Sequence, residues 1–525
     1  MPFPIIDLFA GPGGLAEGFS SLINENNERQ FEVKLSIEKD SHAYQTLLLR
    51  SFLRQFPINK LPDEYYLFLR QKLKLGSLYD LYPHEFDLAS REAWQATLGI
   101  TPEVEVDRRI EEGLGGAQEW VLIGGPPCQA YSLVGRSRVG GIHEGDHRVH
   151  LYKEYLRIIA RHQPSIFVME NVKGLLSAEL NGEKIFHKIL DDLKNPASVF
   201  PGLGASTYRL YSLVKDNVTK DTDYLIRSEE YGVPQKRHRV ILLGIRDDIV
   251  VQPRTLMPSL QNSLGSVIDD LPAVRSVIYR EFLRSELVVT EKGTKKKRTY
   301  ANLEDSYEAW SKRIRAFTEE ILATFENLKY KIEFDPILPE TSGKEYYETT
   351  NSISRKHPLY TWYNDEKLHA AIHHVSRGHL TLDLKRYLFS SLYTKHFGKF
   401  PRMEDYRQFG DDLLPDHENA ESGKFTDRFR VQLPDKPATT VTSHISKDGH
   451  YFIHYDPAQC RSLTVREAAR IQTFPDNYFF CGSRTQQFHQ VGNAVPPYLA
   501  FQIAVVVHET LQPELAQIAA GVEVI

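Results

Sequence analysis

The sequence predicts an α/β protein with a mostly parallel sheet, covered by helices on both faces, and a second, smaller domain. Short apolar runs alternate with helix-like stretches at residues 4–10, 31–37, 120–123, 165–169 and 240–243. Strands joined by crossover helices give this pattern. The alternation stops near residue 250, and a chain of 525 residues is longer than one hydrophobic core usually organises. We therefore expect two folding units.

The first predicted strand, residues 4–10, runs into the turn Gly11-Pro12-Gly13-Gly14 and then into a helical pattern that begins at Leu15. A second strand, residues 31–37, is followed by Glu38 and by a helix-like segment at 42–53. Residues 80–118 are polar, end in several glycines and are typical of an insertion before the strand at 120–123.

Residues 251–455 differ from both flanks. They carry the basic cluster Lys295 to Arg298, many aromatic residues and helical patterns at 307–327 and 381–393, without further alternating strands. Helical patterns return at 463–471 and 498–509, and the last of these is apolar enough to need a large partner surface. We expect one domain to comprise residues 1–250 plus 456–525, with residues 251–455 inserted as the second domain.

Composition indicates an ordinary soluble protein. The chain is 41% hydrophobic and 25% charged, with a formal net charge of -5, so any phosphate binding must come from local basic patches. Three cysteines allow neither a disulfide framework nor a four-thiolate zinc site and favour a reducing compartment. The sequence lacks a signal peptide and the roughly 20-residue apolar run of a membrane helix. We expect a cytoplasmic protein that does not contact a membrane.

The glycine turn fits an adenosine cofactor. Residues Gly11 to Ala16 match the loose G-x-G-x-x-G/A pattern, and Glu38 follows the next strand, where a carboxylate can accept hydrogen bonds from ribose hydroxyls. Glycines let the backbone approach a ligand closely. A plain tight turn or an NAD site explains this motif nearly as well.

A cysteine follows the strand at 120–123. Cys128 comes after Pro126-Pro127 and before the glycine-, serine- and arginine-containing stretch 132–141. A cysteine on a rigid turn at the carboxyl edge of a sheet is where a nucleophile would be presented, although a lone cysteine is more often a buried structural residue.

Two further motifs fall at strand ends. Glu170 and Asn171 follow the strand at 165–169, so Glu170 should lie at the same carboxyl edge as Cys128. The string from Gln235 to Arg239 precedes the strand at 240–243, and alternation would put Gln235, Arg237 and Arg239 on one face. The string His143 to His147 matches H-E-x-x-H, but its internal glycine argues against the helix that this zinc motif requires. We expect no metal site.

Six strings in this order resemble the motif set of the DNA (cytosine-5) methyltransferases. The resemblance covers about residues 1–250 and 455–525. The strings are Asp7-Leu8-Phe9-Ala10-Gly11-Pro12-Gly13-Gly14, Pro126-Pro127-Cys128-Gln129, Glu170-Asn171-Val172, Gln235-Lys236-Arg237-His238-Arg239, Arg461-Ser462-Leu463-Thr464-Val465-Arg466-Glu467 and Gln490-Val491-Gly492-Asn493-Ala494-Val495-Pro496-Pro497.

The resemblance implies a Rossmann-like domain that binds S-adenosylmethionine, with a target-recognition domain inserted in it. Cys128 would be the nucleophile, Glu170 would contact the cytosine N3 and amino group, and Arg239 would meet the ring carbonyl, with Arg237 and Asn171 in support. The cofactor pocket would be lined by Phe9, Gly11, Gly13, Gly14, Leu15, Glu38, Pro127, Leu151, Asn493 and Val495. The loop that closes over DNA would include Gln129, Ser132, Arg136 and Arg138. Where the family has an aspartate for the adenine amino group, this chain has Ser77 after Gly76, or Asp80 nearby.

The chemistry explains these residue types. A thiolate that adds to C6 of cytosine turns C5 into a nucleophile, and the carboxyl group and the guanidinium stabilise the charge that develops on N3 and the carbonyl. The target cytosine must leave the duplex to reach such a site. The resemblance therefore implies double-stranded DNA as the partner, and it points to a monomeric enzyme of the bacterial or phage type, often paired with a restriction endonuclease.

Three alternatives remain. An RNA cytosine-5 methyltransferase would share the core, but the Cys-Phe-Thr string of the tRNA-directed branch does not occur here. A catalytically silent nucleic-acid-binding relative would be expected to lack Cys128 or Glu170. An NAD-dependent oxidoreductase would explain only the glycine turn.

Overall fold

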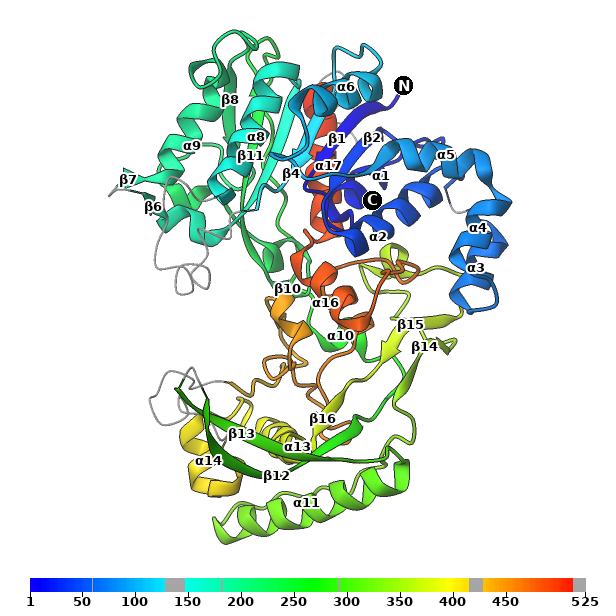
Figure 1. Cartoon of the computed structure of the whole chain (residues 1–525), viewed down its shortest axis with the longest axis vertical. Coiled ribbons are helices and arrows are strands. Elements are labelled where there is room, and N and C mark those ends of the chain that lie inside the picture. The colour runs from blue at the N-terminus through cyan, green and yellow to red at the C-terminus, as the bar shows by residue number, and fades with distance from the viewer. Residues whose placement is uncertain (59, 128–146, 181–182, 291–292, 415–427, 513–525) are drawn as a thin grey trace.

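The computed structural model has two lobes, one above the other in Figure 1. It describes residues 1–512 except 59, 128–146, 181–182, 291–292 and 415–427. The upper lobe holds the large sheet and the last helix of the described chain. The lower lobe holds a long hairpin and the helices around it.

Eight strands form the large sheet, in the order β3-β2-β1-β4-β5-β11-β8, with β9 beside β11. The first five are mutually parallel, whereas β11 runs antiparallel to both β5 and β8. The predicted α/β class with a mainly parallel sheet is thus confirmed. Because β11 is antiparallel to β5, its first residues lie beside the last residues of β5. The strands are β1 (Phe3–Leu8), β2 (Phe31–Glu38), β3 (Ala93–Gln95), β4 (Val121–Gly124), β5 (Ile166–Val172), β8 (Tyr208–Ser212), β9 (Leu225–Arg227) and β11 (His238–Arg246).

Helices cover both faces of this sheet. Successive residues of a strand point to opposite faces, so Leu122 packs under α8 whereas Ile123 packs toward α1 and α17. Each face has its own buried apolar cluster. The helices of the upper lobe are α1 (Gly14–Ser20), α2 (Ser41–Arg54), α6 (Glu103–Leu114), α8 (His147–His162), α9 (Ile185–Lys194) and α17 (Pro497–Leu511).

The last helix, α17, packs directly on the first, α1. A Cβ atom added to Gly18 would lie 2.4 Å from the Ala500 Cβ and 2.4 Å from the Pro497 carbonyl oxygen. Only a residue without a side chain fits at this distance. By length and composition alone, the stretch from Arg484 to Leu511 could cross a membrane, but 67% of its most apolar window is buried inside the protein. Such burial is typical of a core helix.

Residues 80–118 are not an insertion, and the sequence-based expectation was wrong there. They supply β3, which pairs with β2 at the edge of the sheet, and α6, which packs on β2 and β1. The strand has only three residues, too few to show a period of two. Before it come three short helices, α3 (Asp63–Leu69), α4 (Leu75–Leu81) and α5 (Pro83–Glu92).

The lower lobe contains strands that the sequence did not predict. β12 (Val277–Thr290) and β13 (Gly293–Asn302) form a hairpin, and β12 also pairs with β16 (Gly378–Leu380). The alternation of β12 is interrupted by a register shift at Leu283, and its outer part is exposed on both faces, so no period of two is visible. Helices expected at 307–327 and 381–393 are present as α11 (Tyr307–Asn327) and α13 (Thr381–Phe397). The remaining elements include α14 (Met403–Phe409), β14 (Gly343–Glu348) and β15 (Ala370–Val375).

A buried polar centre joins the lobes. The Arg461 guanidinium binds both carboxylate oxygens of Glu467 at 2.7 Å, and each residue is 1% exposed. Glu467 belongs to α15 (Val465–Ile471), whose N-cap Thr464 forms a capping box with it. Around this pair lie His374 of β15 and His454, both buried. The expected helix at 463–471 therefore forms part of the junction between the two lobes.

Candidate active site

Glu170 and Arg239 form an ion pair at the carboxyl end of β5. The Arg239 Nε lies 2.7 Å from the Glu170 Oε1, and the two side chains are only 15% and 14% exposed. The antiparallel register of β11 brings them together, since Arg239 pairs with Val172. Glu170 and Asn171 lie inside β5 and not after it, because the strand continues to Val172. Asn171 is 3% exposed and pairs with Val240 of β11.

The segment that leads to Cys128 passes over Glu170. A Cβ atom added to Gly125 would lie 2.9 Å from the Glu170 Oε2, so the backbone that follows β4 rests against this carboxylate. Pro126 is buried and Pro127 is partly buried. Cys128 itself lies outside the described residues, as do Gln129, Ser132, Arg136, Arg138 and the string from His143 to Asp146.

Arg237 is buried and forms hydrogen bonds with segments that are far from it in the sequence. Its Nη1 donates hydrogen bonds to the Val441 carbonyl at 2.8 Å and to the Gly492 carbonyl at 3.2 Å. Burial, and next the neighbouring Arg239, lowers the pKa of Arg237, whereas Glu170 opposes this shift. The string from Gln235 to Arg239 is divided here between β10 (Gln235–Lys236) and β11, which begins at His238, before the expected strand at 240–243. Arg237 and Gln235 therefore hold β17 (Ala438–Thr439) and neighbouring segments of the junction.

Gly492 and Asn493 lie in a helix, although a Gly-Asn pair is a common signal for a tight turn. They end α16 (Arg484–Asn493), and a Cβ atom on Gly492 would lie 2.3 Å from the backbone of Thr442 and Ser443. The glycine allows this close approach. Asn493 is exposed, whereas Val495 is 8% exposed and its carbonyl oxygen lies against Gly14.

The glycine turn has the left-handed backbone that its composition predicts. The φ angles of Phe9, Gly11 and Gly13 are 57°, 58° and 93°. Gly13 is the N-cap of α1, and a Cβ atom on Gly11 would meet nothing within 4 Å, so space remains above the turn. Leu15 anchors the helix in the core at 6% exposure. Backbone N–H groups at a helix N-terminus suit a polar or anionic ligand.

Glu38 faces this turn from the end of β2. Its Oε2 accepts a hydrogen bond from the Gly11 N–H at 2.8 Å, and its Oε1 accepts one from the Asp40 N–H at 2.8 Å. Burial raises the pKa of Glu38, and the backbone hydrogen bonds oppose this rise. The carboxylate and the turn thus form one unit, although they lie 27 residues apart.

A cavity of about 420 Å³ adjoins Glu38 and was not foreseen. Gln95 lines it and pairs with Glu38 in the sheet ladder. Leu151 lies nearby, since its Cδ2 is 3.7 Å from a Cβ placed on Gly99. Ser77 and Asp80 do not line this cavity; they lie on α4, which packs on α3 and α5. Gln95 ends the strand that begins at Ala93, and this position at a strand end is the signal that could have indicated it. The strand is too short to recognise from the sequence. The lining residues are Lys39, Gln95, Ala96, Thr97, Ile100, Thr101, Pro102 and Glu105.

Tyr478 is a second residue that the sequence did not indicate. Its hydroxyl donates to the Pro12 carbonyl, and its ring lies under the Arg50 guanidinium at 4.4 Å. A residue near the C-terminal end of the chain thus supports the glycine turn from below. No local motif marks it, because the partner lies 466 residues away.

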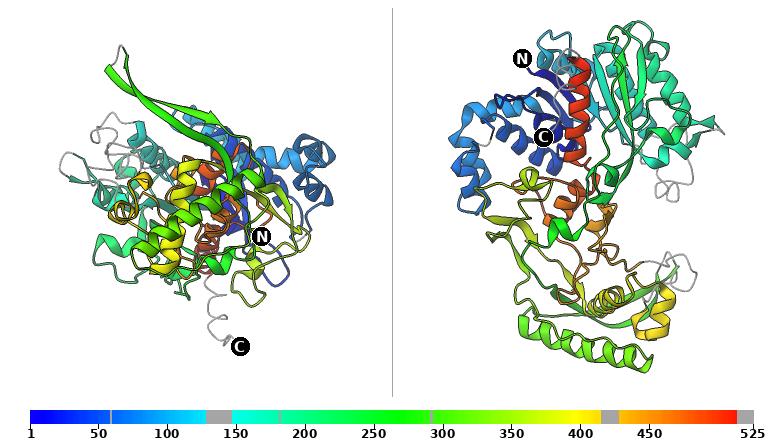
Figure 2. Two further views of the ribbon diagram at one scale, coloured as in Figure 1. Left: turned by 90° about the horizontal axis from the view of Figure 1, so that it is seen from below. Right: turned by 180° about the vertical axis from the view of Figure 1, so that it is seen from behind.

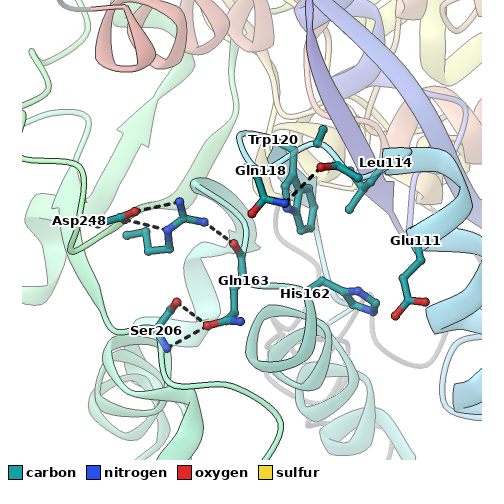
Figure 3. Close-up of a pocket in the computed structure, with 11 residues that line it drawn as sticks. Glu111, Leu114, Gln118, Trp120, His162, Gln163, Ser206 and Asp248 are labelled. Atoms are coloured by element: carbon teal, nitrogen blue, oxygen red, sulfur yellow. Dashed lines mark hydrogen bonds and ion pairs between the residues drawn. The ribbon is translucent and has the colours of Figure 1, made fainter.

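Another cavity of about 420 Å³ lies at the opposite edge of the sheet (Figure 3). Arg246 there binds Asp248 at 2.7 Å and the Gln163 carbonyl at 2.7 Å, and Ser206 binds the Gln163 side chain. His162 binds Asp107 at 2.9 Å. These polar groups satisfy one another.

Comparison with known proteins agrees with this geometry. The family model described as C-5 cytosine-specific DNA methylase matches residues 84–509. The Type II methyltransferase M.Bpa9945I of Bacillus paralicheniformis is 30% identical over 97% of this chain and 99% of its own length. M.DdeI of Desulfomicrobium norvegicum, also a Type II methyltransferase, is 25% identical over 95% and 87%, respectively. The DNA (cytosine-5-)-methyltransferase M.ApeKI of Aeropyrum pernix is 27% identical over 79% and 87%. The chain therefore belongs to the C-5 cytosine-specific DNA methylase family.

Proposed function

We propose that the chain methylates C5 of a cytosine flipped out of a specific double-stranded DNA sequence, through a covalent bond between Cys128 and C6. One observation carries the proposal: Gly125, Glu170 and Arg239 converge at the carboxyl edge of the sheet. Cys128 is three residues beyond Gly125, and three residues span at most about 11 Å. We infer that a tether of this length lets the thiol reach the ion pair.

The described side chains have distinct roles in this reaction. As the Cys128 thiolate adds to C6, the Glu170 carboxyl, protonated from solvent once the base has displaced Arg239 from it, donates this proton to N3, and Arg239 stabilises the charge on the ring carbonyl. The ion pair between them holds Glu170 in place before DNA arrives. Arg237 and Asn171 act by positioning, because both are buried within the framework behind the pair. Once C5 has taken the methyl group, a base removes the C5 proton, and elimination releases the thiolate.

The glycine turn and Glu38 suit S-adenosylmethionine. S-adenosylmethionine supplies an electrophilic methyl group when bound. Phe9, Gly11, Gly13, Gly14 and Leu15 shape the turn, and Glu38 is placed to accept hydrogen bonds from ribose hydroxyls. The cavity beside Gln95 and Leu151 can take an adenine ring, in place of the contact first expected from Ser77 or Asp80. Pro127, Asn493 and Val495 would border the methionine end.

An adduct experiment tests the nucleophile. Duplex DNA with 5-fluorocytosine at the target should give a complex with the wild-type protein that resists denaturation, because fluorine at C5 blocks the final elimination. The target sequence is found first by bisulfite sequencing of DNA from a methylation-free host that expresses the protein. Cys128→Ser should give no adduct, while Cys460→Ser, at a cysteine buried in the apolar cluster around α13, should still give one. An adduct with Cys128→Ser would refute the assignment.

Residues 251–455 are proposed to select the DNA sequence, as an inserted domain between residues 1–250 and 456–525. The position of the lower lobe below the carboxyl edge supports this (Figure 1). A chimera with this segment from a relative of known specificity should acquire that relative's methylation pattern. An active chimera that keeps the original pattern would contradict the proposal.

The remaining expectations stay proposals. Gln129, Ser132, Arg136 and Arg138 would contact DNA as the loop closes. The protein would act as a cytoplasmic monomer, apart from any membrane and without a metal ion, in a bacterium or phage, and a restriction endonuclease would cut the same sequence when unmethylated. The names of the Type II relatives support this last point.

A further inference from the structure

The β12–β13 hairpin is a long two-stranded ribbon that projects from the lower lobe (Figure 2, left). Its strands pair from Arg280–Asn302 to Thr290–Gly293, with Leu283 as an extra residue at a register shift. The fourteen residues of β12 span about 46 Å at ~3.3 Å per residue. The ribbon is therefore longer than the width of a DNA major groove, which is about 12 Å.

Among the described residues, the base of the ribbon is packed against the rest of the lower lobe. Ile278 is 2% exposed and packs in the same cluster as Trp310, while Glu281 binds Arg313 at 2.8 Å. Beyond Phe282 the side chains become exposed: Leu287 is 75% exposed and Val289 is 82% exposed. A two-stranded hairpin is at best marginally stable alone in water, and exposed apolar side chains on it indicate a binding partner.

The charge of the outer ribbon identifies the kind of partner. Among residues 283–290 and 293–298, five are basic and one is acidic, although the whole chain carries a net charge of -5. Arg284, Lys297 and Arg298 are exposed. A second copy of the ribbon would be repelled by this charge, whereas the phosphates of a duplex would attract it.

We propose that the β12–β13 hairpin enters the major groove of the target duplex and contributes to sequence selection there. The groove admits a two-stranded ribbon, basic side chains of the ribbon then reach the phosphates on either side, and Leu287 and Val289 offer apolar contacts to base edges such as thymine methyl groups. This inference rests on the proposed function and goes further, because it assigns one element of the lower lobe and one groove.

Photo-cross-linking locates the ribbon directly. Leu287 is replaced by p-benzoylphenylalanine, and the protein is irradiated with a duplex that contains its methylated sequence. A matched control places the same probe at Ile337, which is 97% exposed in the same lobe. Cross-links to bases within the recognised sequence are expected from position 287 and not from 337. Equal cross-linking from both positions, no cross-link from 287, or cross-links to protein alone would overturn the proposal.

A charge variant measures the same contact energetically. In Arg284→Ser/Lys297→Ser/Arg298→Ser, affinity for the duplex at physiological salt should fall at least about tenfold, and the slope of log K against log salt should become shallower by ~2–3. Arg91→Ser/Arg108→Ser removes two exposed charges on α5 and α6 and should leave both quantities unchanged. An unchanged slope in the hairpin variant would count against groove binding.

The 5-fluorocytosine adduct separates the two proposals. At saturating DNA, the hairpin variant should still form the adduct and keep its S-adenosylmethionine affinity, which also shows that it is folded. Loss of the adduct in the wild-type protein would overturn the proposed function itself. A wild-type adduct together with normal DNA binding by the hairpin variant would overturn only the inference about the ribbon.

Discussion

The carboxyl edge of the sheet and the β12–β13 hairpin are built in opposite ways. At the edge, Glu170 and Arg239 are about 15% exposed, bind each other at 2.7 Å and rest on a framework of buried groups. On the outer hairpin, Leu287 is 75% exposed, and the strand pairs with β13. The edge is organised before any ligand arrives, whereas the hairpin offers surface to a partner.

This difference corresponds to what each region must do. A reaction centre gains from groups fixed in advance, because no reorganisation is then needed as charge develops. A recognition surface must expose the groups that it uses. Before the partner binds, these groups cost little free energy only when they are apolar or solvated by water. Changes at the edge should therefore affect the chemical step, and changes on the hairpin should affect DNA binding.

The largest expected effect is at Glu170. Glu170→Gln keeps the shape of the side chain but removes the acid, so kcat should fall by about 10²–10⁴-fold. Affinity for DNA and for S-adenosylmethionine should change little, which separates this variant from the hairpin variant. Single-turnover methylation and binding titrations measure these quantities. Glu179→Gln, at an exposed position, is the control, and a Glu170→Gln enzyme with near-normal kcat would remove Glu170 from the reaction.

The junction between the two regions should make stability depend on pH. Burial lowers the pKa of His374 to about 4 and lowers the pKa of His454 as well. Between pH ~6.5 and ~4 the unfolded chain then binds more protons than the folded one, so stability is complete above pH ~6.5 and is lost as pH falls. From pH 7.5 to 5 the free energy of unfolding should drop by about 1–2 kcal/mol per histidine.

Urea unfolding at several pH values measures this loss. His374→Gln should flatten the dependence, because it removes one of the titrating groups. His187→Gln changes an exposed histidine and should leave the slope as it is. If the free energy of unfolding stayed constant from pH 7.5 to 5, neither buried histidine would take up a proton in the unfolded chain while staying neutral in the folded chain.

Packing of α1 on α17 gives the next effect. Gly18→Ala places a methyl group 2.4 Å from two atoms of α17, which should cost about 1–3 kcal/mol of stability by overpacking. In Gly113→Ala the nearest neighbours are 3.5 Å away on a helix, so this control should be neutral or stabilising by up to ~1 kcal/mol. Denaturant titration compares the two. Equal stabilities would mean that α17 packs less tightly on α1.

The smallest effect is expected at Tyr478. Tyr478→Phe keeps the ring under Arg50 but removes the hydrogen bond to Pro12, which should weaken S-adenosylmethionine binding by about 3–10-fold. Isothermal titration measures the affinity, and the rate at saturating cofactor should be retained. Tyr79→Phe, at a tyrosine outside the glycine turn, should bind normally. An unchanged affinity would show that the turn holds its shape without Tyr478.

The sequence by itself determined the α/β class and the family, and it supplied the candidate residues for the proposed chemical step. It could do so because the carboxyl ends of strands meet at one edge, so short strings such as Gly11 to Gly14 and Glu170-Asn171 indicate their own location. Glu38 was predictable for the same reason, as the first residue after a recognisable apolar run.

Only the tertiary structure decided the rest. The antiparallel direction of β11 brings Arg239 into its ion pair with Glu170. This direction is set by long-range contacts in the sheet and leaves no local pattern in the sequence. Gln95 lies on a strand of three residues, and Tyr478 reaches Pro12 across 466 positions. The hairpin was missed because both of its faces are exposed in its outer part. A hydrophobic period appears only where one face is buried, and no described residue of the chain buries either face of the outer hairpin.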